Sequence, residues 1–242
     1  MRIGVRVSDP SLLEQLDPFL PPGHQPAPSM EVGVLYSVIL GGRGSRPGVR
    51  RFHVVFAGGE QIHRSHHLDH VLEALEATLR LDLGIRARRR LFIHAGAVGI
   101  RGGGLVIPGR SESGKSTLTR ALLEAGATYF SDEYAVLDAH RKLHPYPIRL
   151  SLAADDPKMP NRRVPASEFG APEAREPAPV RLVLATRYRP GSRFRPRRLT
   201  PARGLLAVLA HAVPAQWRPR STFFGLARLV ETVPVFASDR PD

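Results

Sequence analysis

Hydrophobic residues in the first third of the chain predict two strands followed by a helix. Residues 1–30 are rich in proline, which interrupts regular structure. The apolar segments 32–40 and 52–56 are typical of strands, and the turn between them is rich in glycine and arginine. Apolar residues then recur at helical spacing over residues 68–81. We therefore expect a small N-terminal α+β module over residues 1–88.

The middle of the chain has a strand, turn, strand and helix pattern. Residues 91–100 form an apolar run that predicts a buried strand, and glycines follow in the turn 101–104. Residues 105–107 predict a second strand, which leads into a glycine-rich loop. A helix follows over residues 118–125 and ends at Gly126, because glycine favours helix C-termini.

One long polar segment interrupts the apolar pattern of the last third. Residues 153–179 combine many prolines with charges of both signs, which predicts a long mobile loop or lid. The later apolar segments predict, in order, a strand, a helix, and a helix that runs into a last strand: 180–185, 205–212 and 226–236. Strands that alternate with helices are typical of an α/β fold. We expect residues 89–242 to form an α/β catalytic domain.

Composition excludes several classes of protein. The chain has 242 residues, 42% of them hydrophobic, which is enough for a full-sized core. It has no cysteine, so disulfides and thiolate metal sites are excluded. No apolar run approaches the roughly 20 residues of a membrane span, and no secretory signal is recognisable. We expect a soluble cytoplasmic protein with no membrane partner.

The formal net charge of +13 first suggests a nucleic-acid partner. Almost all of this positive charge is arginine, since the only lysines are Lys115, Lys142 and Lys158. The arginine bias, together with abundant alanine, glycine and proline, is typical of a GC-rich coding sequence. A charge excess alone indicates association rather than chemistry. We therefore do not expect nucleic acid to be the main partner.

The motif that carries chemistry is the loop from Gly109 to Ser116. It matches the P-loop pattern G-x-x-x-x-G-K-[ST] in full, with an apolar strand before it and a helix after it. Glycine lets backbone amides converge on a β-phosphate, and the helix dipole favours the same anion. Lys115 spans the β- and γ-phosphates, and the hydroxyl of Ser116 suits Mg²⁺. The alternative is a glycine turn that only joins a strand to a helix.

The predicted nucleotide-binding residues are the whole loop and the start of the helix. They are Gly109, Arg110, Ser111, Glu112, Ser113, Gly114, Lys115, Ser116 and Thr117. The predicted cofactors are ATP and Mg²⁺, with Ser116 as one metal ligand. This pattern indicates nucleotide binding and leaves the reaction open.

Two carboxylates and a histidine flank this loop in sequence. Asp132 and Glu133 follow a short strand at residues 129–130, so their side chains can project toward a bound γ-phosphate. One carboxylate can hold Mg²⁺, and the other can accept the proton of an attacking hydroxyl. His94 lies on the strand before the glycine loop and can tune Asp132 or contact phosphate. The alternatives are a solvated acidic turn and a histidine packed in the core.

The order of these residues resembles the catalytic core of the HPr kinase/phosphorylase family. The resemblance is carried by three runs: Ile93-His94-Ala-Gly-Ala-Val, Gly104-Leu-Val-Ile-Pro-Gly109-Arg-Ser-Glu-Ser-Gly-Lys-Ser-Thr-Leu, and Gly126-Ala-Thr-Tyr-Phe-Ser-Asp132-Glu133. It covers residues 91–137 and is similar to the shorter HPr-kinase-related proteins, some of which accompany peptide natural-product clusters.

This resemblance implies a fold and a set of roles. The fold is an α/β P-loop core with a mixed sheet of the HPr kinase and phosphoenolpyruvate carboxykinase type. By resemblance, Asp132 is the general base, His94 is a functional position, and Glu133 is a ligand of metal or water. Lys115 completes the predicted catalytic set.

We therefore expect an ATP-dependent kinase that transfers the γ-phosphoryl group to a hydroxyl, with serine of a protein or peptide as the acceptor. A second hypothesis is a small-molecule alcohol kinase on the same core. A third, from another class, is a nucleotide-binding regulatory or scaffold protein with little turnover. Such a protein has no need of a base at Asp132, which argues against the third hypothesis. The sequence leaves the identity of the acceptor and a homo-oligomeric state open.

Two further groups of residues suggest binding sites. Four histidines at helical spacing can hold a metal or form a solvated helix face: His63, His66, His67 and His70. An arginine cluster after the strand at 180–185 can hold an acidic acceptor or the nucleotide phosphates, or form a solvated basic loop: Arg187, Arg189, Arg193, Arg195, Arg197 and Arg198. Arg149, on a predicted strand, is a candidate for steadying the transferred phosphoryl group, although a surface arginine gives the same pattern.

Overall fold

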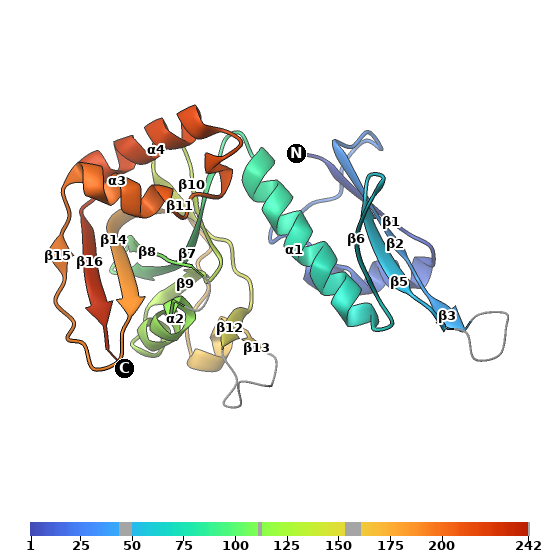
Figure 1. The fold of residues 1–242 in the computed structure, drawn as a ribbon, viewed down its shortest axis with the longest axis horizontal. Helices are drawn as coiled ribbons and strands as arrows, with labels where there is room; N and C mark the ends of the chain where they lie inside the picture. The colour runs from blue at the N-terminus through green and yellow to red at the C-terminus, as the bar shows by residue number, and fades with distance from the viewer. Residues whose placement is uncertain (44–49, 111–112, 153–160, 242) are drawn as a thin grey trace. The chain divides into compact units, whose positions relative to one another are not determined.

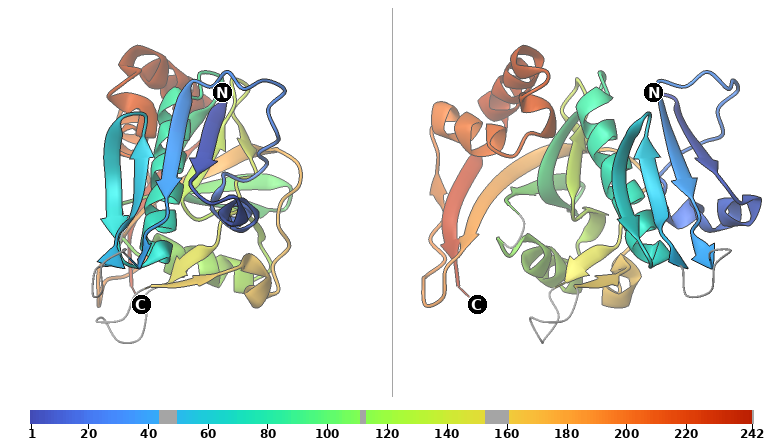
Figure 2. Two further views of the ribbon diagram at one scale, coloured as in Figure 1. Left: turned by 90° about the vertical axis from the view of Figure 1, so that its right-hand side faces the viewer. Right: turned by 45° about the vertical axis from the view of Figure 1, so that its right-hand side comes forward.

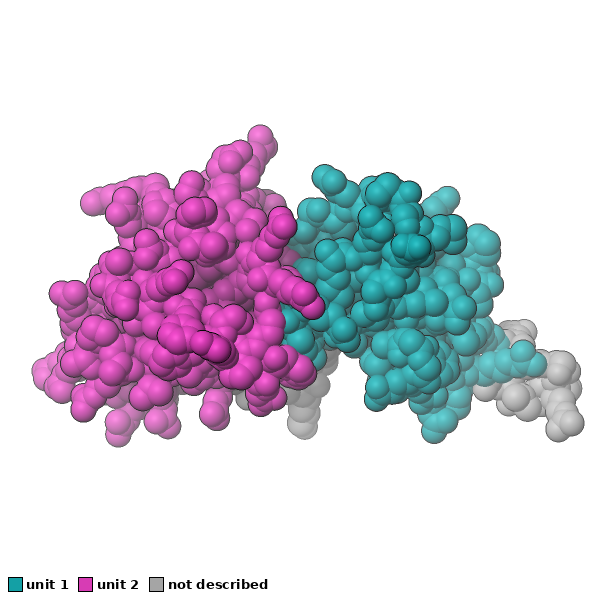
Figure 3. All heavy atoms as spheres, turned by 90° about the horizontal axis from the view of Figure 1, so that it is seen from above, with its two compact units in different colours: residues 1–86 teal, residues 87–242 magenta. Residues whose placement is uncertain are grey.

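The computed structural model describes residues 1–43, 50–110, 113–152 and 161–241. The chain divides into two compact units, unit 1 over Met1–Arg86 and unit 2 over Ala87–Asp242, which are coloured separately in Figure 3. Both units combine helices with strands, so the protein is of the mixed α/β class. None of the helices in the described part of the chain is long and apolar enough to cross a membrane.

Unit 1 is built on a four-stranded sheet with the strand order β1-β2-β5-β6 (Figure 1). β1 runs parallel to β2, and the other neighbours are antiparallel. Its elements before the helix are β1 (Ile3–Val7), η1 (Pro10–Gln15), η2 (Asp17–Phe19), β2 (Val34–Ile39), β3 (Gly42–Arg43), β4 (Arg50–Arg51), β5 (His53–Ala57) and β6 (Glu60–Ser65). The predicted strands at 32–40 and 52–56 are confirmed as β2 and β5.

The helix α1 (Leu68–Arg86) packs on one face of this sheet (Figure 2). Its apolar residues recur every three or four positions, so they form one stripe along the helix. Leu75 and Leu79 are buried in this stripe against Tyr36 and Val55 of the sheet. The predicted helix is confirmed and continues beyond residue 81 to Arg86.

The sequence patterns do not predict β1 and β6, the two edge strands of this sheet. β6 has the sequence Glu-Gln-Ile-His-Arg-Ser, and its side chains are mostly exposed. An edge strand needs only its backbone to pair, so it can lack a run of apolar residues. The helical spacing proposed for the four histidines is wrong, because His63 lies in β6 and only His70 lies in α1.

Unit 2 contains an eight-stranded mixed sheet with the order β11-β10-β7-β8-β14-β16-β15, and β9 also pairs with β7. β7 and β8 form an antiparallel hairpin, whereas β14 runs parallel to both β8 and β16. The turn of the hairpin is at Arg101 and Gly102, which both have positive φ. The strands are β7 (Leu91–Ile100), β8 (Gly103–Pro108), β9 (Thr128–Ser131), β10 (Tyr134–Leu137), β11 (Lys142–His144), β14 (Ala178–Tyr188), β15 (Arg197–Arg198) and β16 (Val235–Arg240).

Helices cover both faces of this sheet (Figures 1 and 2). Alternate residues of β8 point to opposite faces, so Ile107 packs in the cluster of α2 (Lys115–Glu124), whereas Val106 packs on the other side. That other side is covered by α3 (Pro201–Leu209) and α4 (Pro219–Thr232), with the short η4 (Val213–Ala215) between them. The predicted strand, glycine loop, helix and strand order is confirmed as β8, α2 and β9.

The segment 153–179, predicted to be a mobile loop, contains regular structure in its described part. Residues 153–160 lie outside the described residues. The rest contains β13 (Arg162–Val164), which pairs with β12 (Leu150–Leu152), and the 3₁₀ helix η3 (Ala166–Phe169). Val164 and Ala166 are buried in the core on the α2 side of the sheet. Prolines bound these short elements, but the small and β-branched residues between them still pack.

Candidate functional site

The candidate site is organised around two neighbouring residues of β7. The amide of His94 donates to the carbonyl oxygen of His211 at 2.8 Å, and the carbonyl oxygen of His94 accepts from the amide of Gly109 at 3.3 Å. The amide of Ala95 donates to the carbonyl oxygen of Glu133 at 3.1 Å. A central strand thus ties together the glycine loop, the turn after β9 and the segment after α3.

The glycine loop follows β8 and ends where α2 begins. Gly114 is the N-cap of α2 and has a φ of 82°, in the left-handed region that favours glycine. A side chain at Gly114 would clash with Nη2 of Arg240, and a Cβ at Gly109 would lie 2.5 Å from Oγ of Ser113. Among the described residues no side chain caps α2, so its first amides are available to an anion. Ser111 and Glu112, also predicted here, lie outside the described residues.

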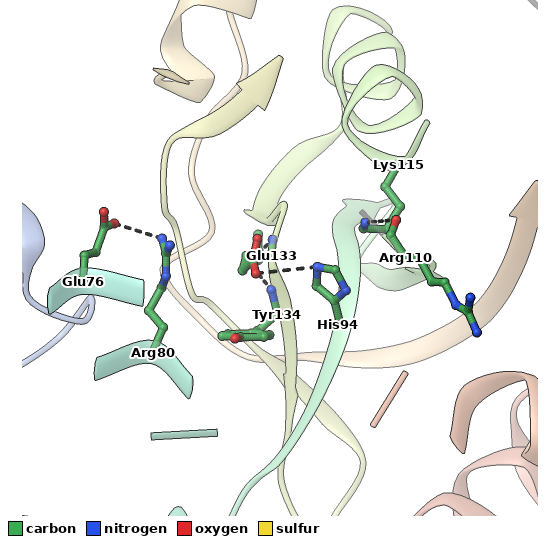
Figure 4. Close-up of polar contacts among 8 residues, drawn as sticks. Glu76, Arg80, His94, Arg110, Lys115, Glu133 and Tyr134 are labelled. Atoms are coloured by element: carbon green, nitrogen blue, oxygen red, sulfur yellow. Dashed lines mark hydrogen bonds and ion pairs between the residues drawn. The ribbon is translucent and has the colours of Figure 1, made fainter. Parts of the chain in front are cut away.

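Lys115 is buried at the start of α2, with 6% of its surface exposed. Its Nζ donates a hydrogen bond of 2.7 Å to the carbonyl oxygen of Arg110, as Figure 4 shows. Burial lowers the pKa of Lys115, and the carboxylates of Asp132 and Glu133 act in the opposite direction. The ammonium group therefore lies between the loop backbone and two carboxylates.

Asp132 is buried directly after β9, and one of its carboxylate oxygens is unpaired. The residue is 5% exposed, and Oδ1 has no hydrogen-bond partner among the described residues. The hydroxyl of Thr119 is also buried and forms no well-aligned hydrogen bond among the described residues, although it lies close enough to Asp132 to lower the pKa of that carboxyl group. Both atoms lie beside Gly96 of β7, where an added Cβ would be 2.5 Å from Thr119 Oγ1 and 3.8 Å from Asp132 Oδ1. Buried polar atoms are almost always hydrogen-bonded, so this pair indicates a place that a ligand or water completes.

The surroundings of Asp132 raise its pKa to about 6 from the ordinary value of 3.8. Burial is the main cause, because the carboxylate loses its solvation by water. A contact with the hydroxyl of Ser116 and the positive charge of Lys115 act against this rise. A carboxylate with such a pKa is ionised at neutral pH and is still basic enough to accept a proton.

The side chains of His94 and Glu133 face each other (Figure 4), and Glu133 follows Asp132 directly in the chain. Nε2 of His94 lies 3.6 Å from Oε1 of Glu133. Burial and the charge of Lys115 lower the pKa of His94, whereas the charge of Glu133 raises it. The lowered pKa keeps the imidazole ring mainly neutral at neutral pH.

Sequence patterns do not identify two further residues of this site, His211 and Thr119. His211 follows α3, and Ile93 and Ala212 form an isolated bridge that brings this segment to β7. Burial lowers the pKa of His211, and so do the nearby charges of His94, Lys115 and Arg110. A lone histidine after an apolar helix and a threonine inside a helix carry no motif, so only the fold reveals them.

A cavity of about 1100 Å³ opens beside the glycine loop within unit 2. Pro108, Gly109, Arg110 and Ser113 form its wall on the side of the loop. Four arginines of the predicted cluster also line it: Arg187, Arg193, Arg195 and Arg197. The rest of the lining is Ala185, Thr186, Tyr188, Ala207, Ala210, His211, Ala237, Ser238 and Asp239.

Several predicted residues are not gathered at this site. Thr117 is exposed on the first turn of α2, and Arg149 is exposed in the segment before β12 rather than on a strand. Arg189 forms an ion pair with Asp239, with 3.5 Å between Nη1 and Oδ2. Among the histidines of unit 1, His66 stacks on a phenylalanine ring, with 3.9 Å between the ring centroids.

The residues of the glycine loop fit Mg²⁺ only together with a nucleotide. Within the described ranges, no three His, Asp or Glu side chains form a group that could hold a metal ion by themselves. Mg²⁺ typically takes one or two protein oxygens and completes its shell with phosphate oxygens and water. Ser116, Glu133 and the unpaired oxygen of Asp132 offer oxygen ligands of this kind.

Comparisons with known proteins give no relative for this chain: no protein-family model matches it, and a search of curated proteins finds no match. The resemblance to the HPr kinase family therefore stays a prediction that rests on the motif residues. What the protein does must be argued from the site.

Proposed function

We propose that the protein is an ATP-dependent kinase with a P-loop core of the HPr kinase type, which transfers the γ-phosphoryl group to serine of a protein or peptide. The observation that carries this proposal is the meeting of a glycine loop with a buried carboxylate. Lys115 and Asp132 are both buried, and the charge of each affects the pKa of the other. A protein that only binds nucleotide needs the first of these residues and not the second.

The glycine loop and α2 bind the phosphates in this proposal. The uncapped amides at the start of α2 donate to phosphate oxygens, and the close packing at Gly109 and Gly114 keeps the loop tight. Lys115 exchanges its hydrogen bond to the Arg110 carbonyl for a charged phosphate oxygen. This exchange is favourable, because the ammonium group then faces the full negative charge of a phosphate oxygen instead of the partial charge of a carbonyl oxygen.

Asp132 takes the proton of the acceptor hydroxyl. The serine oxygen bonds to the γ-phosphorus, the bond to the β,γ-bridging oxygen breaks, and ADP leaves. Ser116 and Glu133 would hold Mg²⁺ together with the nucleotide, and the metal would supply positive charge that neutralises the phosphates. His94, whose ring is mainly neutral, lies 3.6 Å from Glu133 and orients that carboxylate without competing for the proton.

The size of the cavity is compatible with a peptide acceptor. Pockets for single small ligands typically measure about 300–1000 Å³. The cavity beside the glycine loop has about 1100 Å³ and is therefore large enough for a nucleotide and a segment of a second molecule. A small alcohol would use the same base and the same loop, so only the acceptor distinguishes the two hypotheses.

The direct test is transfer of label from γ-labelled ATP to serine-containing peptides in the presence of Mg²⁺. Lys115→Ala and Ser116→Ala should each lower transfer by about 10²- to 10³-fold, the usual effect of removing one such electrostatic contact. Circular dichroism should show that both variants are folded. Lys142→Ala is the matched control, because Lys142 is an exposed lysine on β11, and it should transfer normally.

Near wild-type transfer by both loop variants would show that the chemistry occurs elsewhere. Tight ATP binding without transfer to any hydroxyl, and with slow hydrolysis, would instead support a regulatory nucleotide-binding protein.

A further inference from the structure

The part of the cavity wall formed by β14, β15 and the segment between them carries positive charge beyond what the phosphates of a nucleotide require. Lys115 and the first amides of α2 already provide the positive charge and the hydrogen-bond donors that these phosphates need. The four arginines of this wall, Arg187, Arg193, Arg195 and Arg197, are exposed, and none forms an ion pair with a residue in the described ranges. The one carboxylate in the described lining is Asp239, and it pairs with Arg189. We call these four residues the arginine wall.

Strand pairing holds the arginine wall in place. β16 lies between β14 and β15, so its residues fix the neighbours on both sides. In the backbone register of the sheet, Arg187 of β14 lies beside Asp239 of β16, and Arg197 of β15 lies beside Ala237 of β16. Between them, the amide of Arg195 donates to Oγ of Ser238 at 2.9 Å. The arginines are therefore presented by a sheet and an anchored connection.

We infer that the arginine wall binds the acceptor, and that the acceptor is a peptide segment with acidic side chains next to the serine. This inference rests on the proposed kinase function and adds the class of substrate. The planar guanidinium group binds carboxylates through two parallel hydrogen bonds, which suits Asp and Glu side chains. The wall shares one cavity with Gly109 and Ser113 of the glycine loop, so a bound segment lies within reach of the phosphoryl donor.

The rest of the cavity lining favours a peptide over a nucleic acid. Ala185, Ala207, Ala210 and Ala237 contribute small apolar side chains, which leave room for a peptide backbone. Sites for single-stranded nucleic acid use several aromatic rings on which bases stack. The aromatic residue in the described lining is Tyr188, and the guanidinium of Arg240 already lies 5.3 Å from the centre of its ring.

Arg197 and Arg198 provide a matched pair for the test. They are neighbours on β15, and both are exposed, but successive residues of a strand point to opposite sides. Arg197 lines the cavity, whereas Arg198 does not. Arg197→Glu and Arg198→Glu therefore make the same change in charge, one inside the proposed acceptor site and one outside it.

The experiment measures kcat and KM of the wild type and both variants with three serine peptides, whose flanking residues are glutamate, glutamine or lysine. The wild type should prefer the glutamate peptide. Arg197→Glu should lower kcat/KM for that peptide by about 10- to 100-fold, the range for loss of one charge-assisted contact. The loss should appear in KM, since the wall binds the acceptor away from the reacting atoms. Arg198→Glu should leave kcat/KM for the glutamate peptide unchanged. Both variants should bind ATP as the wild type does.

Four outcomes would overturn the inference while the proposed function stands, and the first three concern the peptides and the variants. These are equal or better transfer to the glutamine or lysine peptide, an equal loss in both variants, and a loss of ATP affinity in Arg197→Glu, which would assign the wall to the nucleotide. Preferential binding of a single-stranded oligonucleotide that competes with the peptides would assign it to nucleic acid. Absence of transfer to every peptide by the wild type, with ATP bound normally, would overturn the proposed function itself.

Discussion

Unit 1 and the region of the glycine loop in unit 2 both place polar side chains in their interior, but more buried polar atoms lack a hydrogen-bond partner near the glycine loop, among the described residues. In unit 1, the hydroxyl of Tyr36 is fully buried and donates to Oδ2 of Asp82 at 2.6 Å. In unit 2, Oδ1 of Asp132 and the hydroxyl of Thr119 are buried near each other, and neither forms a well-aligned hydrogen bond among the described residues. The same chain thus pairs the buried hydroxyl of Tyr36 in unit 1 and leaves several buried polar atoms open near the glycine loop.

The contrast extends to other side chains of the two regions. Arg80 and Glu76 of α1 form an ion pair of 2.9 Å with little exposure (Figure 4), whereas Oγ of Ser113 in the glycine loop is buried and unpaired within the described residues. Nδ1 of His66 is an exception in unit 1. Internally paired groups stabilise a fold, and groups that are left unpaired mark a site that a ligand completes. We therefore expect substitutions in the two regions to separate stability from activity.

The largest expected effect is that of Asp132→Asn. Asparagine keeps the size of the side chain but cannot act as a base, so phosphoryl transfer should fall by about 10²- to 10⁴-fold. ATP affinity should stay within a few-fold, because the loop amides and Lys115 remain. Transfer rates at saturating ATP and peptide, together with calorimetric titration of ATP, measure the two effects.

Asp82→Asn in unit 1 is the control for this substitution, since it makes the same chemical change at a carboxylate that is already paired. It should leave transfer unchanged. If Asp132→Asn lost ATP binding and kept a normal rate at saturation, Asp132 would bind the nucleotide and would not be the base. The unpaired carboxylate would then not mark a catalytic group.

A smaller effect is expected on the pH dependence of stability. The pKa of Asp132 is about 6 in the folded protein and near 3.8 when the chain is unfolded, so the folded state binds this proton more tightly. The free energy of unfolding should therefore decrease as the pH rises from about 4 to 6, by at most about 3 kcal/mol. Asp132→Asn removes this contribution and should unfold at higher urea concentration than the wild type at pH 7.

Urea unfolding of both proteins at pH 4.5 and at pH 7 provides the measurement. The advantage of Asp132→Asn should be larger at pH 7, where the wild type carries a buried charge. In the same pH range, kcat/KM of the wild type should rise and reach a plateau above pH 6, because the base must be ionised. An equal difference in stability at both pH values would mean that Asp132 titrates as an ordinary exposed carboxyl group.

The part of unit 2 that the sequence predicts best is also the part with the strongest local signals. β7 and β8 are continuous apolar runs, and the loop and α2 are bounded by Gly109, Gly114 and Gly126. These signals lie within a short stretch of chain, so no distant contact is needed to recognise them. For the same reason Asp132, Glu133 and His94 could be identified as candidates before their positions were known.

The missed features depend on contacts between distant segments. β6 is a polar edge strand, and β13 and η3 are short elements among prolines. None of the three has apolar residues at a regular spacing that sequence analysis could recognise. His211 joins the site through a backbone hydrogen bond to β7, from a segment more than a hundred residues away in the chain. The arginine wall was predicted only in part. The arginine cluster is visible in the sequence, but only the pairing of β15 in the sheet shows that Arg197 lines the cavity and Arg198 does not.

The smallest expected effect is that of Tyr36→Phe in unit 1. The substitution removes one hydroxyl and keeps the buried ring, so it leaves no cavity. Asp82 loses the hydrogen bond of 2.6 Å but keeps its contact with Nε of Arg86 at 3.4 Å, and its partial exposure lets water replace the hydroxyl. The free energy of unfolding should fall by about 1–2 kcal/mol, the usual cost of losing one hydrogen bond to a charged group.

Urea unfolding of the full chain measures this loss, and transfer to the glutamate peptide should be unchanged at a temperature where the variant is folded. A fall in transfer as large as that of Asp132→Asn, with stability unaltered, would place part of the active site in unit 1 and would contradict the division into a stabilising and a catalytic set of polar residues.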